Sequence, residues 1–294
     1  MSSAFDRLKA KGLLQGAPWF MENNTQLEVI MGSVAYGVSN DTSDMDVYGF
    51  CMPPKEYIFP HLRGEITDFS TQGKTFTTWQ QHHIDDPESR KNYDLCIYSI
   101  QRFFRLCMEN NPNMIDALFV PRRCVLHSTA IGELVRENRK LFLHKGSWPK
   151  FKGYAYGQLN KMRTKKPEGK RLAIIEEFGF DVKFAYHVVR LIGEVEQILT
   201  TGDLDLESNR EVLKAIRAGE WTKERITDYF ESKEKQLEQV YADSKLPYSP
   251  DEEAIRALLM KCIESHYGSI DAVTRDSDLR KTLMEIGTLV NEAL

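Results

Sequence analysis

The stretch Met31–Phe50, MGSVAYGVSNDTSDMDVYGF, decides how the rest of this sequence is interpreted. It begins inside LEVIMGS (27–33), a run typical of a buried strand that ends at Gly32. Glycine has no Cβ, so the backbone there can approach a ligand closely. A short helix is expected to open over Ser33–Tyr36, and the free N–H groups at its start would attract phosphate oxygens. The Ser33 hydroxyl adds one more donor.

Two aspartates, Asp44 and Asp46, follow the turn-forming residues VSNDT. Residues i and i+2 of a strand face the same side, about 6.6 Å apart, so both carboxylates are expected to point at whatever the Gly-Ser turn holds. Mg²⁺ prefers oxygen ligands and is commonly held by one or two carboxylates plus substrate phosphates. A turn followed by an exposed strand is the alternative explanation of the pair.

A third carboxylate on a neighbouring strand would complete a two-metal site. The best candidate is Asp94, within the strand-like run NYDLCIYSI (92–100). The alternatives for this position are Asp68, Asp85 and Asp86.

The composition is ordinary for a globular protein, with 41% hydrophobic and 28% charged residues among 294. No apolar run approaches the ~20 residues that span a bilayer, and the first residues lack an apolar signal segment, so we expect a soluble, cytoplasmic protein with no membrane partner. Five scattered cysteines predict reduced core thiols rather than disulfides or structural zinc. A net charge of -4 argues against a globally basic nucleic-acid binder, although a local basic patch can still neutralise phosphates.

The predicted secondary structure changes along the chain. From about residue 26 to 125, short strand-like runs alternate with turns, and after His127 long segments carry helical periodicity. We therefore predict two domains, an α/β or α+β domain over 1–127 and an all-helical domain over 128–294.

The pattern GSVAYGVSNDTSDMD (32–46) resembles the signature of the DNA polymerase β-type nucleotidyltransferase superfamily: Gly-Ser, a short helix, then Ser-Asp-x-Asp on the next strand. Its spacing is especially similar to that of the minimal nucleotidyltransferases. Two further segments, 99–121 and 178–206, resemble the phage and bacterial predicted nucleotidyltransferases of the RNA repair pathway polymerase β family. The resemblance implies an α+β fold, in which a polymerase β-like nucleotidyltransferase domain with a mixed sheet is followed by an all-helical C-terminal domain.

The same resemblance implies a reaction and its residues. A nucleoside monophosphate would move from an NTP, with ATP as the leading candidate, to an acceptor hydroxyl, and pyrophosphate would be lost with the help of Mg²⁺ or Mn²⁺. The residues that would bind the nucleotide are Gly32, Ser33 and Ser43. The metal ligands and catalytic residues would be Asp44, Asp46 and Asp94, and Asp94 would also help to deprotonate the acceptor hydroxyl.

Lys183, His187 and Arg190 recur at helical spacing in DVKFAYHVVR, so they share one helix face. A solvated face with a partly packed histidine explains this pattern as well as a functional stripe does. The family resemblance is densest here, however, and such a stripe facing the cleft would suit a triphosphate or an RNA phosphate. We therefore count all three as nucleotide-binding candidates.

The run KMRTKKPEGKR (161–171) has six basic residues and one acidic residue. A solvated loop is the usual meaning of such a run, and nucleic-acid contact is the alternative. Tyr154 and Tyr156 lie just before it, where they would either stack on a base or pack within the helical half.

Two further pairs of residues resemble functional residues, but we do not assign them to the site. His82 and His83 have no third metal ligand at sensible spacing, so we expect them in a loop. Asn111 and Asn113 flank Pro112 at a turn into a helix, so we assign them to capping.

These features predict a metal-dependent nucleotidyltransferase, with RNA or tRNA ends as the leading acceptor. One alternative is antitoxin-like nucleotidylation of a protein, or transfer to a small-molecule hydroxyl. Another is a nucleotide-binding regulatory module, because fold does not fix function. The presence of all three carboxylates favours catalysis.

Overall fold

In the computed structural model of this protein, the described residues are 3–39, 44–63, 75–165 and 169–269, together with 286, 289 and 290. Some positions considered above lie outside this set: Ser43, Asp68 and 166–168 of the basic run.

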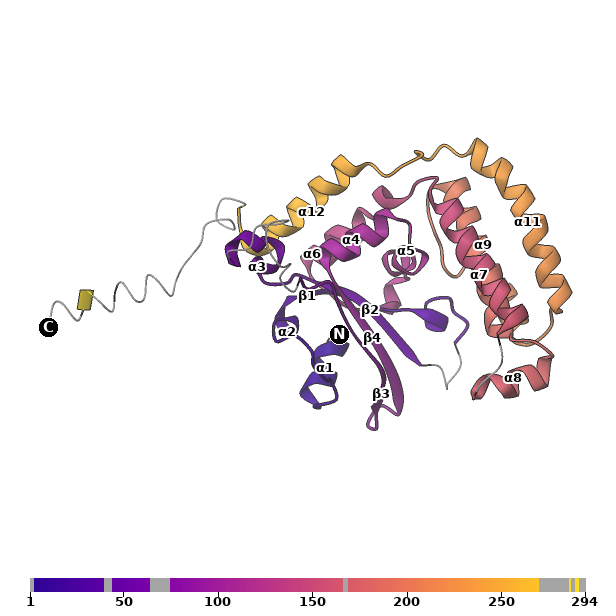
Figure 1. Ribbon diagram of the computed structural model, residues 1–294, viewed down its shortest axis with the longest axis horizontal. Helices are drawn as coiled ribbons and strands as arrows, with labels where there is room; N and C mark the ends of the chain where they lie inside the picture. The colour runs from indigo at the N-terminus through magenta and orange to yellow at the C-terminus, as the bar shows by residue number, and fades with distance from the viewer. Residues whose placement is uncertain are drawn as a thin grey trace.

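A five-stranded mixed sheet, with strand order β3-β4-β2-β1-β5, lies at the centre of the fold (Figure 1). The strands are β1 (Thr25–Ile30), β2 (Met45–Cys51), β3 (Thr78–Asp86), β4 (Lys91–Ser99) and β5 (Val125–Ser128). β2 and β4 are parallel, and the other neighbouring pairs are antiparallel. The mixed sheet and the many helices confirm the predicted α+β class.

Successive side chains of each strand point to opposite faces of the sheet, and different helices cover the two faces. Val47 of β2, with Leu95 and Ile97 of β4, packs in a cluster with α1 (Ala4–Ala10) and α2 (Met21–Asn24). Phe50 belongs to the cluster on the opposite face, where its ring lies 4.9 Å from that of Phe103 in α4 (Ile100–Met108). β1 is buried at every position, as the LEVI run predicts.

Helices dominate the chain after the sheet. They are α5 (Pro112–Phe119), α6 (Ala130–Glu137), α7 (Ser147–Thr164), α8 (Lys170–Phe178), α9 (Val182–Thr201), α10 (Arg210–Arg217), α11 (Lys223–Asp243) and α12 (Glu252–Tyr267). Shorter helical elements are α3 (Lys55–Ile58), η1 (Gly32–Val34), η2 (Pro60–Arg63), η3 (Arg122–Cys124) and η4 (Arg139–Phe142). α9 begins at the cap residue Asp181, whose carboxylate accepts from two backbone N–H groups, and ends at the left-handed Gly202.

One hydrophobic cluster joins residues of β1 with residues of α7, α9 and α11. The sheet and the helical half therefore share a continuous core. The division at 127/128 stays a prediction, and β5 runs across it to Ser128.

All five cysteines are buried free thiols, as expected. Burial raises the pKa of the Cys107 thiol well above its usual value, so this thiol stays protonated and unreactive. Within the described part of the chain, no helix is both long enough and apolar enough to cross a membrane.

Glu28 of β1 is fully buried and ties the N-terminal helix to the sheet. Its carboxylate accepts hydrogen bonds from the Ser3 hydroxyl (2.6 Å) and from the backbone N–H groups of Ala4 (2.6 Å) and Phe5 (3.4 Å). Changing Glu28→Ala would leave these donors without their acceptor, so we expect a loss of about 3 kcal/mol in the free energy of unfolding.

Urea denaturation followed by circular dichroism measures this loss. Glu22→Ala is the matched control, because Glu22 forms only an exposed pair with Lys9 and should cost less than about 1 kcal/mol. Equal effects of the two changes would contradict the role given to Glu28.

Candidate active site

The sheet brings two of the predicted carboxylates together. Asp46 on β2 lies directly opposite Asp94 in the parallel pairing of β2 with β4. Asp44 comes immediately before β2 and is exposed. The Asp94 side chain keeps 28% of its surface exposed, so both partners of the pair reach solvent only in part.

The Gly-Ser turn lies against this pair. Gly32 has φ +66°, and a Cβ built there would be 2.3 Å from Oδ2 of Asp46. Any other residue would collide with the carboxylate and would also be strained in that backbone conformation. The expected short helix is a single 3-10 turn, η1, closed by the Ala35 N–H donating to the Gly32 carbonyl.

Electrostatic repulsion is concentrated at Asp46. Burial is the largest cause that raises the pKa of Asp46, to about 6, and the negative charges of Asp94 and Asp44 raise it further. His82 and Lys183 oppose the rise with weaker positive contributions. A cation between the carboxylates would remove the repulsion.

The donor set fits a hard divalent cation, because carboxylate oxygens are the ligands that Mg²⁺ prefers. Asp44, Asp46 and Asp94 are the residues that would hold it. In the arrangement described, no three His, Cys, Asp or Glu side chains of the described residues are already close enough together to form a metal site. Two observations fit a cation at this place. Negative charges crowd around Asp46, and Gly32 has no Cβ, which leaves space beside the Asp46 carboxylate.

A cavity of about 170 Å³ opens beside Asp46, between the sheet and the helical half. Its lining residues are Met31, Gly32, Tyr36, Asp46, Tyr48, Asn113, His187 and Arg190. The structure thus brings together four residues that the sequence predicts as functional, two from the sheet region and two from α9. Ser33, Asp44, Asp94 and Lys183 do not line this cavity.

Positive charges surround His187 on the helical side of the cavity. Burial lowers the pKa of His187 well below its usual value, and the charges of four cations lower it further: Arg190, Arg171, Arg217 and Lys183. His187 is therefore neutral at pH 7 in a positive environment. Such an environment suits phosphate oxygens.

The α9 stripe consists of Lys183, His187 and Arg190, and its two cations differ in how their charge is compensated. Arg190 is buried, and its guanidinium donates to Oδ2 of Asp116 (2.5 Å) and to both oxygens of Glu194 (2.9 Å). Tyr36 donates to the same Asp116 oxygen at 2.7 Å. Lys183 is exposed and forms no ion pair with any described residue. Lys183 is accordingly the member best placed to gain an anionic ligand.

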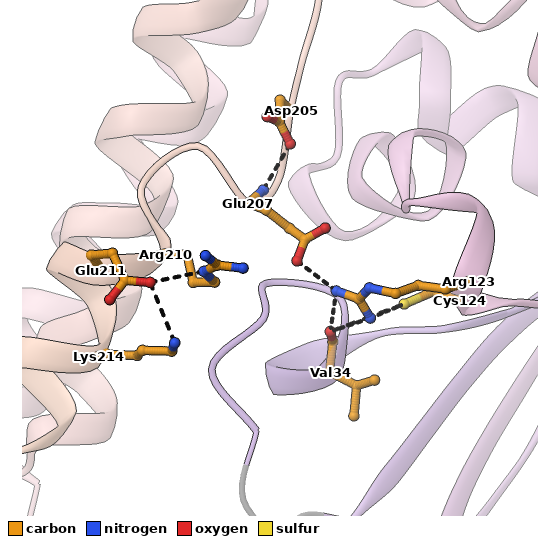
Figure 2. A network of polar contacts seen from close by, with 8 residues as sticks. All are labelled: Val34, Arg123, Cys124, Asp205, Glu207, Arg210, Glu211 and Lys214. Atoms are coloured by element: carbon orange, nitrogen blue, oxygen red, sulfur yellow. Dashed lines mark hydrogen bonds and ion pairs between the residues drawn. The ribbon is translucent and has the colours of Figure 1, made fainter.

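A clamp behind the Gly-Ser turn joins it to the helical half (Figure 2). Both terminal nitrogens of Arg123 donate to the Val34 carbonyl at 3.2 Å, and one also pairs with Glu207 at 2.7 Å. Arg217 of α10 donates to the Val38 carbonyl at 2.6 Å. The sequence reasoning missed these residues, because contacts between such distant positions leave no local pattern.

His82 and His83 lie on β3, so the expectation of a loop is wrong. The register of β3 against β4 shifts between Gln81 and Ile84, and His83 at this bulge has φ +55°. The His83 N–H donates to Oδ1 of Asp94 at 2.7 Å, and Nδ1 of His82 lies 3.3 Å from Oδ2. The strand continues beyond these polar residues because its pairing with β4 resumes at Ile84, and both Asp94 oxygens are held from β3.

Comparison with known proteins classifies the chain. The sequence profile of the RNA repair pathway DNA polymerase beta family (RlaP) matches residues 19–261. The chain belongs to this family. The match spans the Gly-Ser turn, all three carboxylates and α9, and it confirms the resemblance seen in the sequence.

Relatives of the RlaP chain add little about its activity. It is 26% identical over 155 residues to an uncharacterized 38.9 kDa protein in the nrdC-mobD intergenic region of Enterobacteria phage T4. That alignment spans 52% of this chain but only 42% of the phage protein. A solved nucleotidyltransferase-like protein from Exiguobacterium sibiricum 255-15 aligns at 10% identity, covering 98% of this chain and 89% of that one, with a TM-score of 0.29.

The described alternatives to Asp94 as the third metal-binding carboxylate, Asp85 and Asp86, lie away from Asp46. Asp86 is buried in an ion pair with Lys11 at 2.9 Å, and Asp85 lies opposite Asn92 near the hairpin tip. Asp94 is the one that faces Asp46.

The turn before α5 confirms one assignment and corrects the other. Asn111 caps α5 by accepting from the Asn113 N–H at 3.1 Å, as expected. Asn113, also assigned to capping from the sequence, is instead the second residue of α5, and its side chain lines the cavity.

The basic run is not one loop, contrary to expectation. Its first residues, 161–164, complete α7. Arg171 pairs with the α9 cap residue Asp181, and its guanidinium lies 4.2 Å from the Phe184 ring centroid. Arg171 therefore supports the start of α9, and it is a poor choice for testing nucleic-acid contact.

Proposed function

We propose that this protein is a metal-dependent nucleotidyltransferase that moves a nucleoside monophosphate from an NTP to an acceptor hydroxyl. The observation that carries the proposal is the pairing of Asp46 with Asp94 beside Gly32, together with the positive charges that surround His187 of α9. Membership of the RlaP family supports it. We take ATP as the nucleotide and an RNA or tRNA end as the acceptor, for which the family's name is the main support.

In the proposed reaction, the acceptor oxygen forms a bond to the α-phosphorus, and the bond from that phosphorus to the bridging oxygen of the leaving group breaks. Pyrophosphate leaves, and Asp94 accepts the hydroxyl proton. The residues that would hold Mg²⁺ are Asp44, Asp46 and Asp94. The bound ion would neutralise charge on the attacking and leaving oxygens.

The other residues position the nucleotide. Gly32 and Ser33 would lie along the triphosphate, and Lys183 would donate to its oxygens from α9. His187 is neutral, so it can donate one hydrogen bond without adding charge. We propose that residues 1–127 form a domain that carries the catalytic carboxylates. Residues 128–294 would form a second domain that contacts the nucleotide through α9.

The test incubates the full chain with each α-³²P-labelled NTP, Mg²⁺ and separate RNA and protein extracts. Labelled RNA that is absent with the Asp44→Ala, Asp46→Ala variant would support the proposal. A labelled protein band instead would favour the antitoxin-like alternative. Absence of label in both extracts, with a small-molecule fraction also unlabelled, would contradict transfer.

The clamp gives a separate prediction about nucleotide binding. Arg123→Ala removes the donors that hold the Val34 carbonyl, so the turn should lose its fixed position and the KM for NTP should rise about tenfold, with kcat changed less. Steady-state kinetics at varied NTP concentration measures both constants.

Lys214→Ala is the matched control for the clamp. Lys214 belongs to the same polar network, but its ammonium group pairs with Glu211 of the same helix, at 3.3 Å, and not with the Gly-Ser turn (Figure 2). It should leave the KM for NTP unchanged. If both variants behave alike, the clamp does not position the turn.

A further inference from the structure

The order of strands in the sheet separates two sides of the carboxylate pair. Gly32 follows β1, Asp46 lies on β2, Asp94 on β4 and His82 on β3, and the strand order places these in sequence across the sheet. The cavity, with His187 and Arg190 of α9 in its lining, lies on the β1 and β2 side. A nucleotide bound there leaves the β4 and β3 side of Asp94 as the direction from which an acceptor arrives.

Alternation along the strands shows which side chains an acceptor meets there. Val47, Leu95, Ile97 and Trp79 face the cluster around α1. The opposite face, beside Asp46 and Asp94, therefore carries a different set of side chains. We call this set the open strip: Tyr98, Gln80 and His82, with Tyr48 of β2 at its border, where it also lines the cavity.

The open strip is accessible. Gln80 and His82 are exposed, and Tyr48 and Tyr98 are half-buried. β3 is an edge strand, so no strand of the described sheet lies beyond it. In Figure 1 the β3–β4 hairpin extends away from α4 and α5, which lie toward the other end of the sheet.

The chemistry of the open strip is that of a surface for stacking and hydrogen bonding. The Tyr48 and Tyr98 ring centroids lie 6.3 Å apart, and Gln80 offers an amide with both donors and an acceptor. Arg102 of α4 lies near enough to Tyr98 for its positive charge to oppose the rise in the tyrosine pKa that burial causes. Partly exposed aromatic rings with an amide and an adjacent cation suit the binding of unstacked bases.

We infer that the open strip binds the terminal nucleotides of a single-stranded polynucleotide acceptor, with a base stacked on Tyr98 and its hydroxyl end directed toward Asp94. The inference rests on the proposed function for the identity of the reacting hydroxyl. It adds a location and a recognition chemistry that favour a nucleic-acid end over a protein or small-molecule acceptor.

The test measures two affinities for each variant. Fluorescence anisotropy with a labelled single-stranded RNA oligonucleotide of mixed sequence reports acceptor binding, and competition with a fluorescent ATP analogue in Mg²⁺ reports nucleotide binding. Tyr98→Leu should weaken RNA binding by about tenfold, because it removes one stacking ring, and nucleotide affinity should stay within twofold. Tyr98→Phe keeps the ring and should retain RNA binding.

Two further variants guard against misfolding and general surface effects. Gln80→Glu places a negative charge at an exposed position of an edge strand and should also weaken RNA binding. Tyr248→Leu is the control, because Tyr248 is 73% exposed and lies outside the open strip. Wild-type RNA affinity in both Tyr98→Leu and Gln80→Glu, or equal loss in Tyr248→Leu, would overturn the inference.

The outcomes also separate this inference from the proposed function. RNA binding that depends on Tyr98 without any nucleotide transfer would uphold the open strip and reject the reaction. Transfer to a protein by a chain that binds no RNA would uphold the reaction and reject the open strip.

Discussion

Asp46→Asn is expected to reduce nucleotide transfer by at least about a thousandfold, because charge stabilisation by metal ions is the main catalytic contribution in phosphoryl-type transfer. Asn has the same shape as Asp but a weaker, neutral oxygen donor. Asp46 is the carboxylate that both faces Asp94 and contacts the Gly32 turn. The loss should appear in kcat as well as in kcat/KM, measured with labelled NTP and saturating Mg²⁺.

The same change should not lower stability in the absence of metal. Asp46 is crowded by burial and by the charges of Asp94 and Asp44, so removing its negative charge removes repulsion in the folded state. Asp85→Asn is the control, because Asp85 is exposed and lies opposite Asn92, away from the pair. A rate above a tenth of wild type in Asp46→Asn, with correct folding, would contradict the assignment.

Arg190→Met is expected to lower the free energy of unfolding by about 3–5 kcal/mol. Met fills much of the same volume, but it leaves Asp116 and Glu194 buried without their shared cation. Removing one partner from a buried ion network costs far more than removing an exposed pair. Chemical denaturation of the full chain measures the loss.

Two variants sharpen this prediction. Arg105→Met breaks the exposed pair with Glu109 and should cost less than about 1 kcal/mol. Adding Asp116→Asn and Glu194→Gln to Arg190→Met should recover part of the lost stability, because the stranded charges are then neutralised. A loss below 1 kcal/mol in Arg190→Met would show that the network is not the support inferred here.

The site was predictable from the sequence where its pattern is local. The Gly-Ser turn and Asp46 lie within one stretch of chain, and Asp94 lies in a run whose strand character is clear, so their meeting follows from pairing two predicted strands. The stripe on α9 follows from helical spacing alone. The partners of Arg190 do not, because Asp116 comes from α5. A fold-supporting arginine therefore could not be told from a phosphate-binding one by the spacing within α9.

The remaining features depend on contacts between distant positions. Arg123 meets Glu207 across 84 positions, and the bulge that brings His82 to Asp94 depends on the register of β3 against β4. Neither has a sequence signal of its own. The nucleotide-binding roles of Ser33, Lys183, His187 and Arg190 stay predictions, and Ser43 lies outside the described residues.

The most direct measurement of the central claim is to follow which phosphorus of the nucleotide moves. The full chain, Mg²⁺ and RNA are incubated in parallel with ATP labelled at the α- or at the γ-phosphate, and products are separated by chromatography. Nucleotidyl transfer predicts that the α-label enters RNA while the γ-label appears in pyrophosphate, both lost with Asp46→Asn. A γ-label in RNA or in inorganic phosphate, with the α-label left in ADP, would contradict the account.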